Sequence, residues 1–497
     1  MENFFLQFPS TTSLLVTVGI LLVFYVFFSG FNQRKGPPGP WPLPLIGNLL
    51  QLDPKSPHTT FYQLSKKYGP VFSFHIGPQK MVVFAGHKMV KHALVSTDAF
   101  SEKEVPPIIK DMKLTHGVGF TNGDTWKEMR QFALTNMKDF GMGKTIIEEK
   151  ILEESQQLIE VFMEENGKAF DTARPINYAI SNIVSSIVFG NRFEYDDPVF
   201  VSMVGRAAKN THLMGSALIQ LYNIFPRLFG WLQARKQLVE STFVNRRHIK
   251  QLVKGLQETL NPQMCRGVVD SFLARKMQLE ESGNLNSHYN EDNLLVTVVN
   301  LFAAGTDTTS ATLRYGLLLM AKYPKIQDKV QDEMNRVVGS RQVRVEDRKK
   351  LPYTDAVIHE IQRVANAVPT TLHRTAEDTI FQGYFIKKGT PALFLLSSAL
   401  FDEDEWETPH VFNPGHFLNK EGKFRKRDAL LPFSAGARTC AGESLARMEL
   451  FLFFASLLQH FRFVPPPGVK EEDLDLTQIV GFTLTPTPHE LCAISRV

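Results

Sequence analysis

The sequence predicts a mainly α-helical protein with a minor β region. Apolar residues recur at helical spacing over most of the 497 residues, whereas runs of β-branched and aromatic residues are few and short. Hydrophobic residues make up 43% of the chain, which is enough for a large core. After residue 50, no long linker, low-complexity tract or internal repeat divides the chain. We therefore expect one large folded body behind a distinct N-terminal segment.

That N-terminal segment, residues 1–33, has the composition of a membrane anchor. No charged residue occurs between Glu2 and Arg34, and residues 14–28 are apolar apart from a threonine. A helix through this region reaches about 30 Å, the thickness of a bilayer core. A cleaved signal peptide is the alternative, but basic residues follow the apolar run rather than precede it. Because Arg34 and Lys35 should stay in the cytoplasm, we expect the folded body to lie there too.

Residues 34–50 are rich in proline, which excludes a helix and favours a stiff extended path. We interpret this segment as a hinge that sets the tilt of the body, residues 51–497, against the membrane.

The three cysteines, Cys265, Cys440 and Cys492, are too few and too widely separated for a disulfide framework. Their spacing favours a reducing compartment. The net charge of +4 is too mild to indicate a nucleic acid partner.

Short strands and a clear helix can be placed within the body. Two runs, Val71–Ile76 and Met81–Phe84, flank a Gly-Pro pair and are predicted to form a hairpin. Phe381–Ile386 and Pro391–Leu396 are predicted as further strands. Residues 324–339 read as a helix, because they begin with proline and end at glycine.

The longest predicted helix extends from Asn290 to about Tyr323. Asn290 is a suitable N-cap, and two acidic residues occupy the first turn. The middle is almost entirely apolar but carries Ala-Ala-Gly-Thr-Asp-Thr-Thr over residues 303–309. Buried polar side chains are costly unless hydrogen-bonded, and Gly305 weakens the helix at the same place. Such a conflict is expected at a functional site, although packing against another polar group would also explain it.

Residues 433–442, Phe-Ser-Ala-Gly-Ala-Arg-Thr-Cys-Ala-Gly, form the most informative pattern. They place Cys440 directly before a helical stretch, whose unpaired backbone N–H groups favour a thiolate. Gly436 and Gly442 let the backbone approach a large flat group, and Arg438 could bind an anionic part of that group. A buried structural cysteine is the alternative, but haem iron held by a cysteine thiolate fits every part of the loop.

This loop resembles the haem-thiolate signature of the cytochrome P-450 monooxygenases, and the similarity extends from Gly36 to the C-terminus. The resemblance implies the cytochrome P-450 fold, with haem b (iron protoporphyrin IX) buried between the long central helix and the cysteine loop. It also implies that Cys440 is the iron ligand and that Phe433, Arg438 and Gly442 contact the cofactor.

Further motifs extend the resemblance to other parts of the cofactor site. Asp307 and Thr308 match the family's acid–alcohol pair, which implies that they supply protons during oxygen activation. Trp126-Lys-Glu-Met-Arg130 matches a contact to a haem propionate, although a surface cation–π pair would have the same spacing. His373 resembles another propionate contact, and the arginine that follows it is the competing candidate.

Glu360 and Arg363 match the family's Glu-x-x-Arg motif, which implies a structural role behind the haem rather than the solvated ion pair usual for this spacing. The third member of that network is normally an arginine in a Pro-x-Arg-Phe string. Here His416 takes its place, as in many family-two members, which leaves the charge of the network at neutral pH open.

The chain is thus similar to the microsomal, family-two cytochromes P-450. The resemblance implies an unspecific monooxygenase of the endoplasmic reticulum membrane, an oxidoreductase acting on paired donors with incorporation of O2. Electrons would come from NADPH through NADPH–cytochrome P-450 reductase, with cytochrome b conceivable as a second donor. The absence of a glycine-rich dinucleotide fingerprint from the sequence agrees with an external donor. Membrane lipid is an expected partner and nucleic acid is not.

The substrate pocket is encoded less clearly. By resemblance we expect its lining to include Leu301, Phe302, Ala303, Val368, Leu372 and Val480. These mostly apolar residues favour a lipophilic substrate, although each one is explained equally well as ordinary core. A fatty acid, a steroid or a xenobiotic remains possible, and a fatty acid is slightly favoured.

Three other functions agree with parts of the sequence. A haem-thiolate isomerase or dehydratase would share Cys440 but would not need the pair Asp307 and Thr308. A haem carrier or sensor would bind haem without turnover, and a membrane receptor with a coincidental loop would not retain haem.

Overall fold

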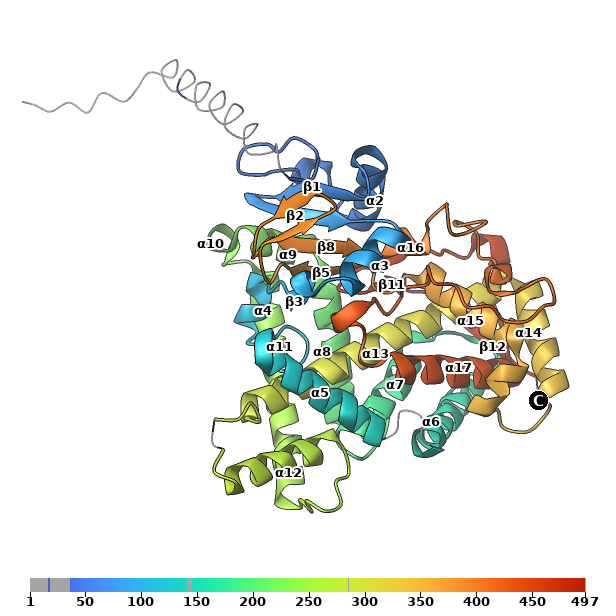
Figure 1. Cartoon of the computed structure of the whole chain (residues 1–497). Coiled ribbons are helices and arrows are strands. Elements are labelled where there is room, and N and C mark those ends of the chain that lie inside the picture. The colour runs from blue at the N-terminus through green and yellow to red at the C-terminus, as the bar shows by residue number, and fades with distance from the viewer. Residues whose placement is uncertain (1–16, 18–35, 141–144, 285, 497) are drawn as a thin grey trace, which may run out of the picture.

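The computed structural model describes residue 17 and residues 36–140, 145–284 and 286–496 (Figure 1). The anchor predicted over residues 1–33 therefore lies outside the described residues, apart from Thr17. Within the described ranges, no helix combines the length and the hydropathy needed to cross a bilayer. The proline-rich segment runs beside the first strand, where the Ser73 backbone N–H donates to the Pro38 carbonyl at 2.6 Å.

Helices dominate the described part of the chain, so the predicted class, mainly α with a minor β region, is confirmed. The α-helices are α2 (Pro57–Tyr68), α3 (His87–Val95), α4 (Pro107–Asp111), α5 (Gly123–Asp139), α6 (Thr145–Glu164), α7 (Ala173–Val188), α8 (Pro198–Gly215), α9 (Ala217–Ile224), α10 (Pro226–Phe229), α11 (Gln233–Glu258), α12 (Val268–Glu281), α13 (Glu291–Lys322), α14 (Pro324–Val337), α15 (Pro352–Ala365), α16 (Leu396–Leu400) and α17 (Glu443–His460). Short 3₁₀ turns include η5 (Pro414–Phe417) and η6 (Gly436–Arg438).

The central helix α13 crosses the middle of the molecule and packs against α7, α15 and α17 (Figure 1). Asn290 caps it as predicted, because its side chain accepts a hydrogen bond from the backbone N–H of Asn293. Gly305 has a packing role, since a Cβ at this position would lie 2.7 Å from Cγ2 of Val184 on α7. The main hydrophobic core surrounds this crossing and includes residues of α6, α7, α14 and α17.

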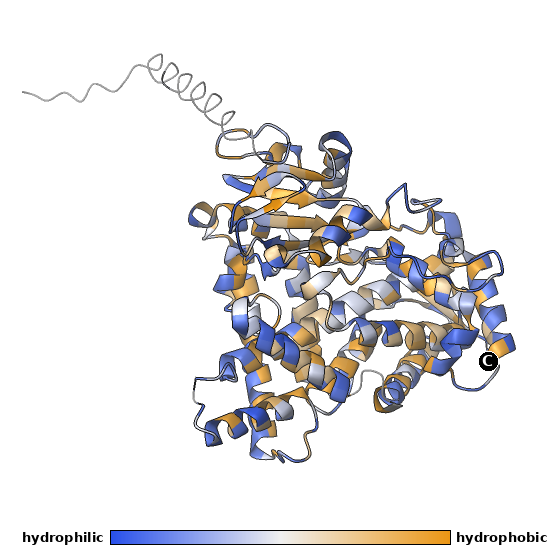
Figure 2. Cartoon of the chain, viewed as in Figure 1, coloured by the Kyte–Doolittle hydropathy of each residue, from blue (hydrophilic) through white to orange (hydrophobic). Residues whose placement is uncertain are grey.

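The β region lies beside the helical part and contains the predicted hairpin, β1 (Val71–Ile76) and β2 (Gln79–Phe84). The largest sheet has five strands in the order β1-β2-β8-β5-β3, with β8 (Pro391–Leu395) parallel to β2 and antiparallel to β5 (Thr370–Arg374). The short strand β3 (Glu102–Lys103) completes it. Figure 2 shows hydrophobic residues concentrated along these strands, in agreement with their buried side chains.

The predicted strand Phe381–Ile386 is wrong, because two short strands occupy this region. These are β6 (Thr379–Phe381) and β7 (Tyr384–Ile386), which pair antiparallel. The turn residues Gln382 and Gly383 have φ angles of 51° and 78°, so the chain reverses there in the left-handed region that suits a tight hairpin. The remaining strands are β4 (Ala169–Asp171), β9 (Phe461–Val464), β10 (Gln478–Val480), β11 (Leu484–Pro486) and β12 (Glu490–Ser495).

Candidate active site

The cysteine loop is held in one conformation by its own backbone and by α3. The Cys440 N–H donates to the Phe433 carbonyl at 3.0 Å, and the Thr439 hydroxyl donates to the same oxygen at 3.3 Å. Gly436 has a φ of 72°, and a Cβ there would lie 1.8 Å from the Leu94 carbonyl oxygen. No residue with a side chain fits at this position, because the conformation and the close approach both exclude one.

Burial and nearby polar groups act on the Cys440 thiol in opposite directions. Burial raises its pKa, and Glu443 adds to this effect, whereas the N–H of Gly442 and the charge of Arg130 lower it. The helix terminus therefore does not by itself produce a thiolate, since burial has the largest effect. Cys440 is nevertheless exposed, so its side chain reaches open space although protein surrounds it. A bound metal ion deprotonates a coordinating thiol outright, which makes Cys440 a suitable iron ligand.

Two arginines, Arg130 of α5 and Arg438 of the loop itself, lie over the ring of Trp126 of α5. The Arg438 guanidinium lies 3.6 Å from the Trp126 ring centroid, and the Arg130 guanidinium lies 5.8 Å from it. Arg438 Nε donates to the Ser101 carbonyl at 2.8 Å, but its Nη1 is buried and has no partner among the described residues. Arg130 Nη2 donates to the Thr439 carbonyl at 2.7 Å and so braces the loop. The helical spacing of Trp126 and Arg130 thus places both against the cysteine loop.

A lysine joins this cluster from strand β3. Lys103 Nζ lies 2.6 Å from Thr371 Oγ1 and 3.0 Å from His373 Nε2. Burial, with the charges of Arg438 and Arg130, lowers the pKa of Lys103 to about 7. Sequence reasoning missed Lys103, because only the pairing of β3 with β5 brings it opposite His373.

Of the two residues predicted as alternative propionate contacts, His373 and Arg374, the buried one is His373. Its Nδ1 lies 2.7 Å from the Phe100 carbonyl oxygen, and burial, with the nearby Lys103, lowers its pKa well below the usual value. Arg374 points away and forms an ion pair with Glu102 at 2.9 Å. The structure thus brings His373, and not Arg374, together with the arginines.

The cluster of Lys103, Arg130 and Arg438 fits a group that carries two negative charges. Burial and Arg130 lower the pKa of Arg438 to about 9, as expected when like charges are buried close together. Buried cations are normally paired, and the unsatisfied Nη1 of Arg438 marks where an anion would bind. A flat macrocycle with two carboxylates, such as haem, would neutralise these cations beside the loop that carries Cys440.

The polar residues 306–308 of α13 are hydrogen-bonded, which resolves the conflict that their sequence presents. The Thr308 hydroxyl donates to the Ala304 carbonyl at 2.8 Å, and Thr306 Oγ1 lies 3.1 Å from Ser181 Oγ. Asp307 accepts a hydrogen bond from the Thr483 hydroxyl, and burial raises the pKa of its carboxyl.

Ala304 is exposed although it occupies the middle of the central helix, so α13 borders an open space at this point. Sequence reasoning missed this residue, because an alanine in an apolar helix carries no signal.

The predicted pocket residues divide into two groups. Leu301, Ala303, Val368 and Val480 are half-buried, as residues that line a site would be. Phe302 is instead buried in the main core, and Leu372 packs against the aromatic cluster of the large sheet. Strand alternation explains Leu372, because it projects from the face of β5 opposite to His373. Phe302 therefore lies apart from the half-buried residues, whereas Leu372 is itself half-buried and its role in the pocket stays a prediction.

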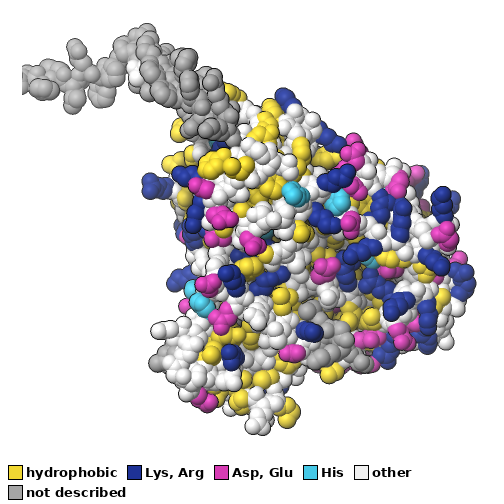
Figure 3. Space-filling view, viewed as in Figure 1, with side chains coloured by type: hydrophobic (Ala, Val, Ile, Leu, Met, Phe, Trp, Pro, Cys, Tyr) yellow, Lys and Arg dark blue, Asp and Glu magenta, His cyan; other side chains and the backbone are white. Residues whose placement is uncertain are grey.

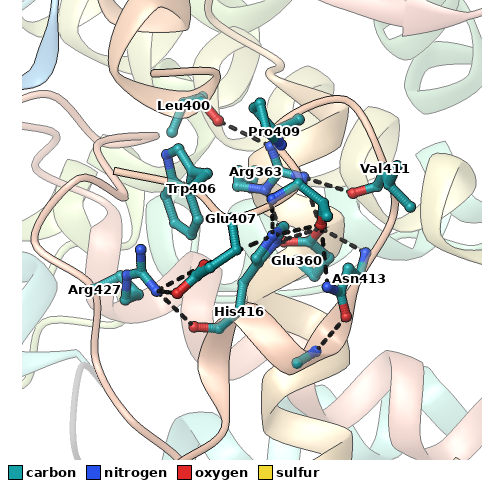
Figure 4. Close-up of polar contacts among 12 residues, drawn as sticks. Glu360, Arg363, Leu400, Trp406, Glu407, Pro409, Val411, Asn413, His416 and Arg427 are labelled. Atoms are coloured by element: carbon teal, nitrogen blue, oxygen red, sulfur yellow. Dashed lines mark hydrogen bonds and ion pairs between the residues drawn. The ribbon is translucent and has the colours of Figure 1, made fainter. Parts of the chain in front are cut away.

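Glu360, Arg363 and His416 meet as the motif implied (Figure 4). Arg363 is fully buried and forms two hydrogen bonds with Glu360, at 2.7 and 2.8 Å. Both Glu360 oxygens lie 3.2 Å from Nδ1 of His416, which joins the network from η5. This buried arrangement ties α15 to the segment that leads to the cysteine loop.

Comparison with known proteins identifies the class that this fold and site define. The family model for cytochrome P450 matches residues 37–493. "Cytochrome P450 2K1" of Oncorhynchus mykiss is 60% identical over 497 residues, with 99% of each chain covered. "Cytochrome P450 2K6" of Danio rerio is 54% identical, with 100% of this chain and 99% of the relative covered. "Cytochrome P450 2F2" of Rattus norvegicus is 41% identical, with 97% and 98% covered.

The chain is therefore a haem-thiolate monooxygenase that belongs to the cytochrome P-450 family. The relatives place it within family two of that family. Membership establishes haem as the cofactor and implies a redox partner and a substrate that reacts with O2.

Proposed function

We propose that Cys440 is the haem iron ligand and that Arg130, Arg438, Lys103 and His373 hold the propionates. Trp126 supports both arginines, and Phe433 and Gly442 border the ligand. The observation that carries this assignment is the group of half-buried cations around the buried, unpaired Arg438 Nη1, beside an exposed thiol. When bound, the haem supplies the activation of O2 that lets one oxygen atom enter a C–H or C=C bond.

Asp307 and Thr308 are proposed to supply protons at the open side of α13. Thr308 Oγ1 is oriented by its bond to the Ala304 carbonyl, which leaves its lone pairs free to accept a proton. Asp307 is held by Thr483, and burial favours the protonated form of its carboxyl. A carboxyl poised in this way can release a proton to the neighbouring hydroxyl and take up another from water.

The proposed substrate is a lipophilic small molecule such as a fatty acid, a steroid or a xenobiotic. The half-buried Leu301, Ala303, Val368 and Val480, with Ala304, offer apolar surface and no charge. A molecule that buries apolar surface against such a lining gains about 25 cal/mol for each Å² removed from water.

NADPH is the proposed source of electrons, delivered by NADPH–cytochrome P-450 reductase, with cytochrome b as a second candidate donor. The face that carries α3, α5 and α17 is closest to the cysteine loop, and Figure 3 shows basic side chains on this side of the molecule, with acidic ones among them. Lys88, Lys127 and Lys138 are exposed on these elements. Such a surface suits an acidic protein partner, because complementary charge steers association.

We place the protein at the endoplasmic reticulum membrane, with residues 1–33 as anchor, 34–50 as hinge and 51–497 as the catalytic domain in the cytoplasm. Large apolar side chains near the hinge support this proposal, since Leu45 is 79% exposed and Trp231 is 68% exposed. The turn after β1 joins the two regions, because Gly77 lies against Ile224 of α9. Exposed apolar surface of this kind favours contact with lipid.

A carbon monoxide difference spectrum of the reduced protein tests the ligand assignment. We expect a strongly red-shifted Soret band in the wild type, its loss in Cys440→Ser, and its retention in Cys265→Ser, the matched cysteine control. Retention of the band in Cys440→Ser would contradict the assignment.

Turnover with NADPH and the reductase tests the reaction, with a fatty acid, a steroid and a neutral aromatic compound as substrates. Oxygenated product from at least one of them is expected. A thiolate spectrum without any product would favour a haem carrier.

A further inference from the structure

A further, largely buried arginine lies on the central helix, away from the cation cluster at the cysteine loop. Arg314 follows Asp307 by seven residues, so the two side chains lie about two turns apart on one face of α13. Its side chain is 11% exposed, and its Nε has no partner among the described residues. The nearest carboxylate is that of Asp171 on β4, with Oδ1 at 4.0 Å from Arg314 Nη2. A buried guanidinium with such weak pairing needs further polar neighbours.

His489 is the next polar residue in this region. It precedes β12, where Glu490 pairs with Asp171 of β4, so the histidine lies close to that carboxylate. His489 Nδ1 lies 2.7 Å from the Thr487 carbonyl oxygen and therefore carries the proton, which leaves Nε2 as an acceptor. This Nε2 is buried and has no partner within the described part of the chain. Burial lowers the pKa of His489, and the charges of Arg314 and Asp171 act on it as well, in opposite directions.

The hydroxyl of Thr172, directly after Asp171, is also buried and has no partner among the residues described. Thus Arg314, His489 and Thr172 each carry a buried polar atom that protein does not satisfy. Buried polar groups of this kind are normally satisfied by ordered water. The outer end of the set is open to solvent, since the side chain of Asp171 is 54% exposed.

The inner end of the set is Asp307. The charge of Arg314 acts on the Asp307 carboxyl and opposes the effect of burial on its pKa. Thr483, in the loop between β10 and β11, donates to the same carboxyl and fixes its orientation. Polar groups therefore extend from the surface at Asp171 to the acid of the proposed proton-donating pair.

We propose that protons enter the active site along this route, from Asp171 through His489 and water held by Arg314 to Asp307. The proposal rests on the proposed function and adds to it the source of the protons. A proton from solvent binds the Asp171 carboxylate and passes to Nε2 of His489, the resulting imidazolium gives it to water, and that water passes a proton to the Asp307 carboxylate and is left neutral. Only O–H and N–H bonds form and break, and no electrons move. Arg314 keeps its proton throughout and acts as a positioning residue.

The route is tested with Arg314→Met, Arg314→Lys and His489→Phe in the full-length holoenzyme. The matched control is Arg206→Met, because Arg206 of α8 also lies beside a histidine, with Nη2 at 2.9 Å from His248 Nδ1. Product formed per NADPH, peroxide release and the solvent deuterium isotope effect on product formation are measured.

We expect Arg314→Met and His489→Phe to lower product per NADPH by about tenfold, to release more peroxide and to increase the isotope effect. This loss is smaller than the hundredfold or more expected for removing an acid–base group, because other water still reaches Asp307. Arg314→Lys, which keeps the charge, and Arg206→Met should behave as the wild type.

A second measurement does not depend on turnover. In the resting holoenzyme, the infrared band of the protonated carboxyl that disappears in Asp307→Asn is followed against pH. In Arg314→Met this carboxyl should keep its proton to higher pH, because the nearby positive charge that favours the carboxylate is gone. A merely structural role for Arg314 would lower the yield of holoenzyme without moving this titration.

Unchanged coupling and isotope effect in both variants, with an unchanged Asp307 titration, would overturn the route. In that case Thr308→Ala would still release peroxide, and the proposed function would stand. A wild type that forms a thiolate spectrum but no oxygenated product would instead overturn the proposed function, and the route with it.

Discussion

Breaking the buried network around Glu360 should destabilise the haem-bound protein strongly. Arg363 forms two hydrogen bonds with Glu360 and three with the carbonyl oxygens of Leu400, Pro409 and Val411. Arg363→Met removes all of them and leaves a buried carboxylate whose remaining partners are His416 and the backbone N–H of Asn413. Removing one member of a buried ion pair costs about 3–5 kcal/mol, or roughly two to four orders of magnitude in the unfolded population.

The assay is urea unfolding of the holoenzyme, followed by the thiolate Soret band and by near-ultraviolet circular dichroism. Lys276→Met is the control, because its ion pair with Glu280 at 3.6 Å lies on the surface and should contribute within about 0.5 kcal/mol. A change in Arg363→Met no larger than that of the control would refute the reasoning. It would mean that the free-energy cost of burying the arginine and the carboxylate equals the free energy gained from their mutual attraction.

Three further predictions concern single side chains. Thr308→Ala should lower product per NADPH by about a hundredfold, the lower end for loss of an acid–base group, and raise peroxide release. Thr312→Ala is its control, because this hydroxyl makes the same bond to a carbonyl one turn back, at 2.8 Å; equal coupling in the two variants would contradict the proton-donating role. Lys103→Met should speed haem transfer to an apoglobin by about tenfold, because it removes one charge-assisted hydrogen bond to the cofactor. Lys127→Met is the control, and equal transfer rates in the two variants would exclude Lys103 from the propionate site. Burial raises the pKa of Glu449 to about 8, above its unfolded value, so the stability that this residue contributes is lost as pH rises from about 4.5 to 8. Glu449→Gln should therefore become more stable relative to the wild type across this pH window. Urea midpoints of the two proteins that stay parallel with pH would disprove this prediction.

Local sequence determines the elements that carry the chemistry. The central helix begins at its predicted cap, Asn290, and the ligand helix α17 begins directly after the glycine of the cysteine loop. The hairpin of β1 and β2 also follows from its own residues. The missed turn at Gln382 and Gly383 shows the limit of such reasoning, because a run of apolar residues outweighed a two-residue turn signal.

What the sequence by itself determined is the haem-thiolate loop, the acid and alcohol on α13, and the helical class. Each of these depends on neighbours within about ten residues. The tertiary structure decided which polar side chains gather beside the cysteine loop, since Lys103, Arg130, His373 and Arg438 come from four separate elements. It also decided that Leu372 faces the sheet core, because strand register sets the side of β5 from which each side chain projects. Such pairings join residues that lie far apart in the chain, and local spacing carries no record of them.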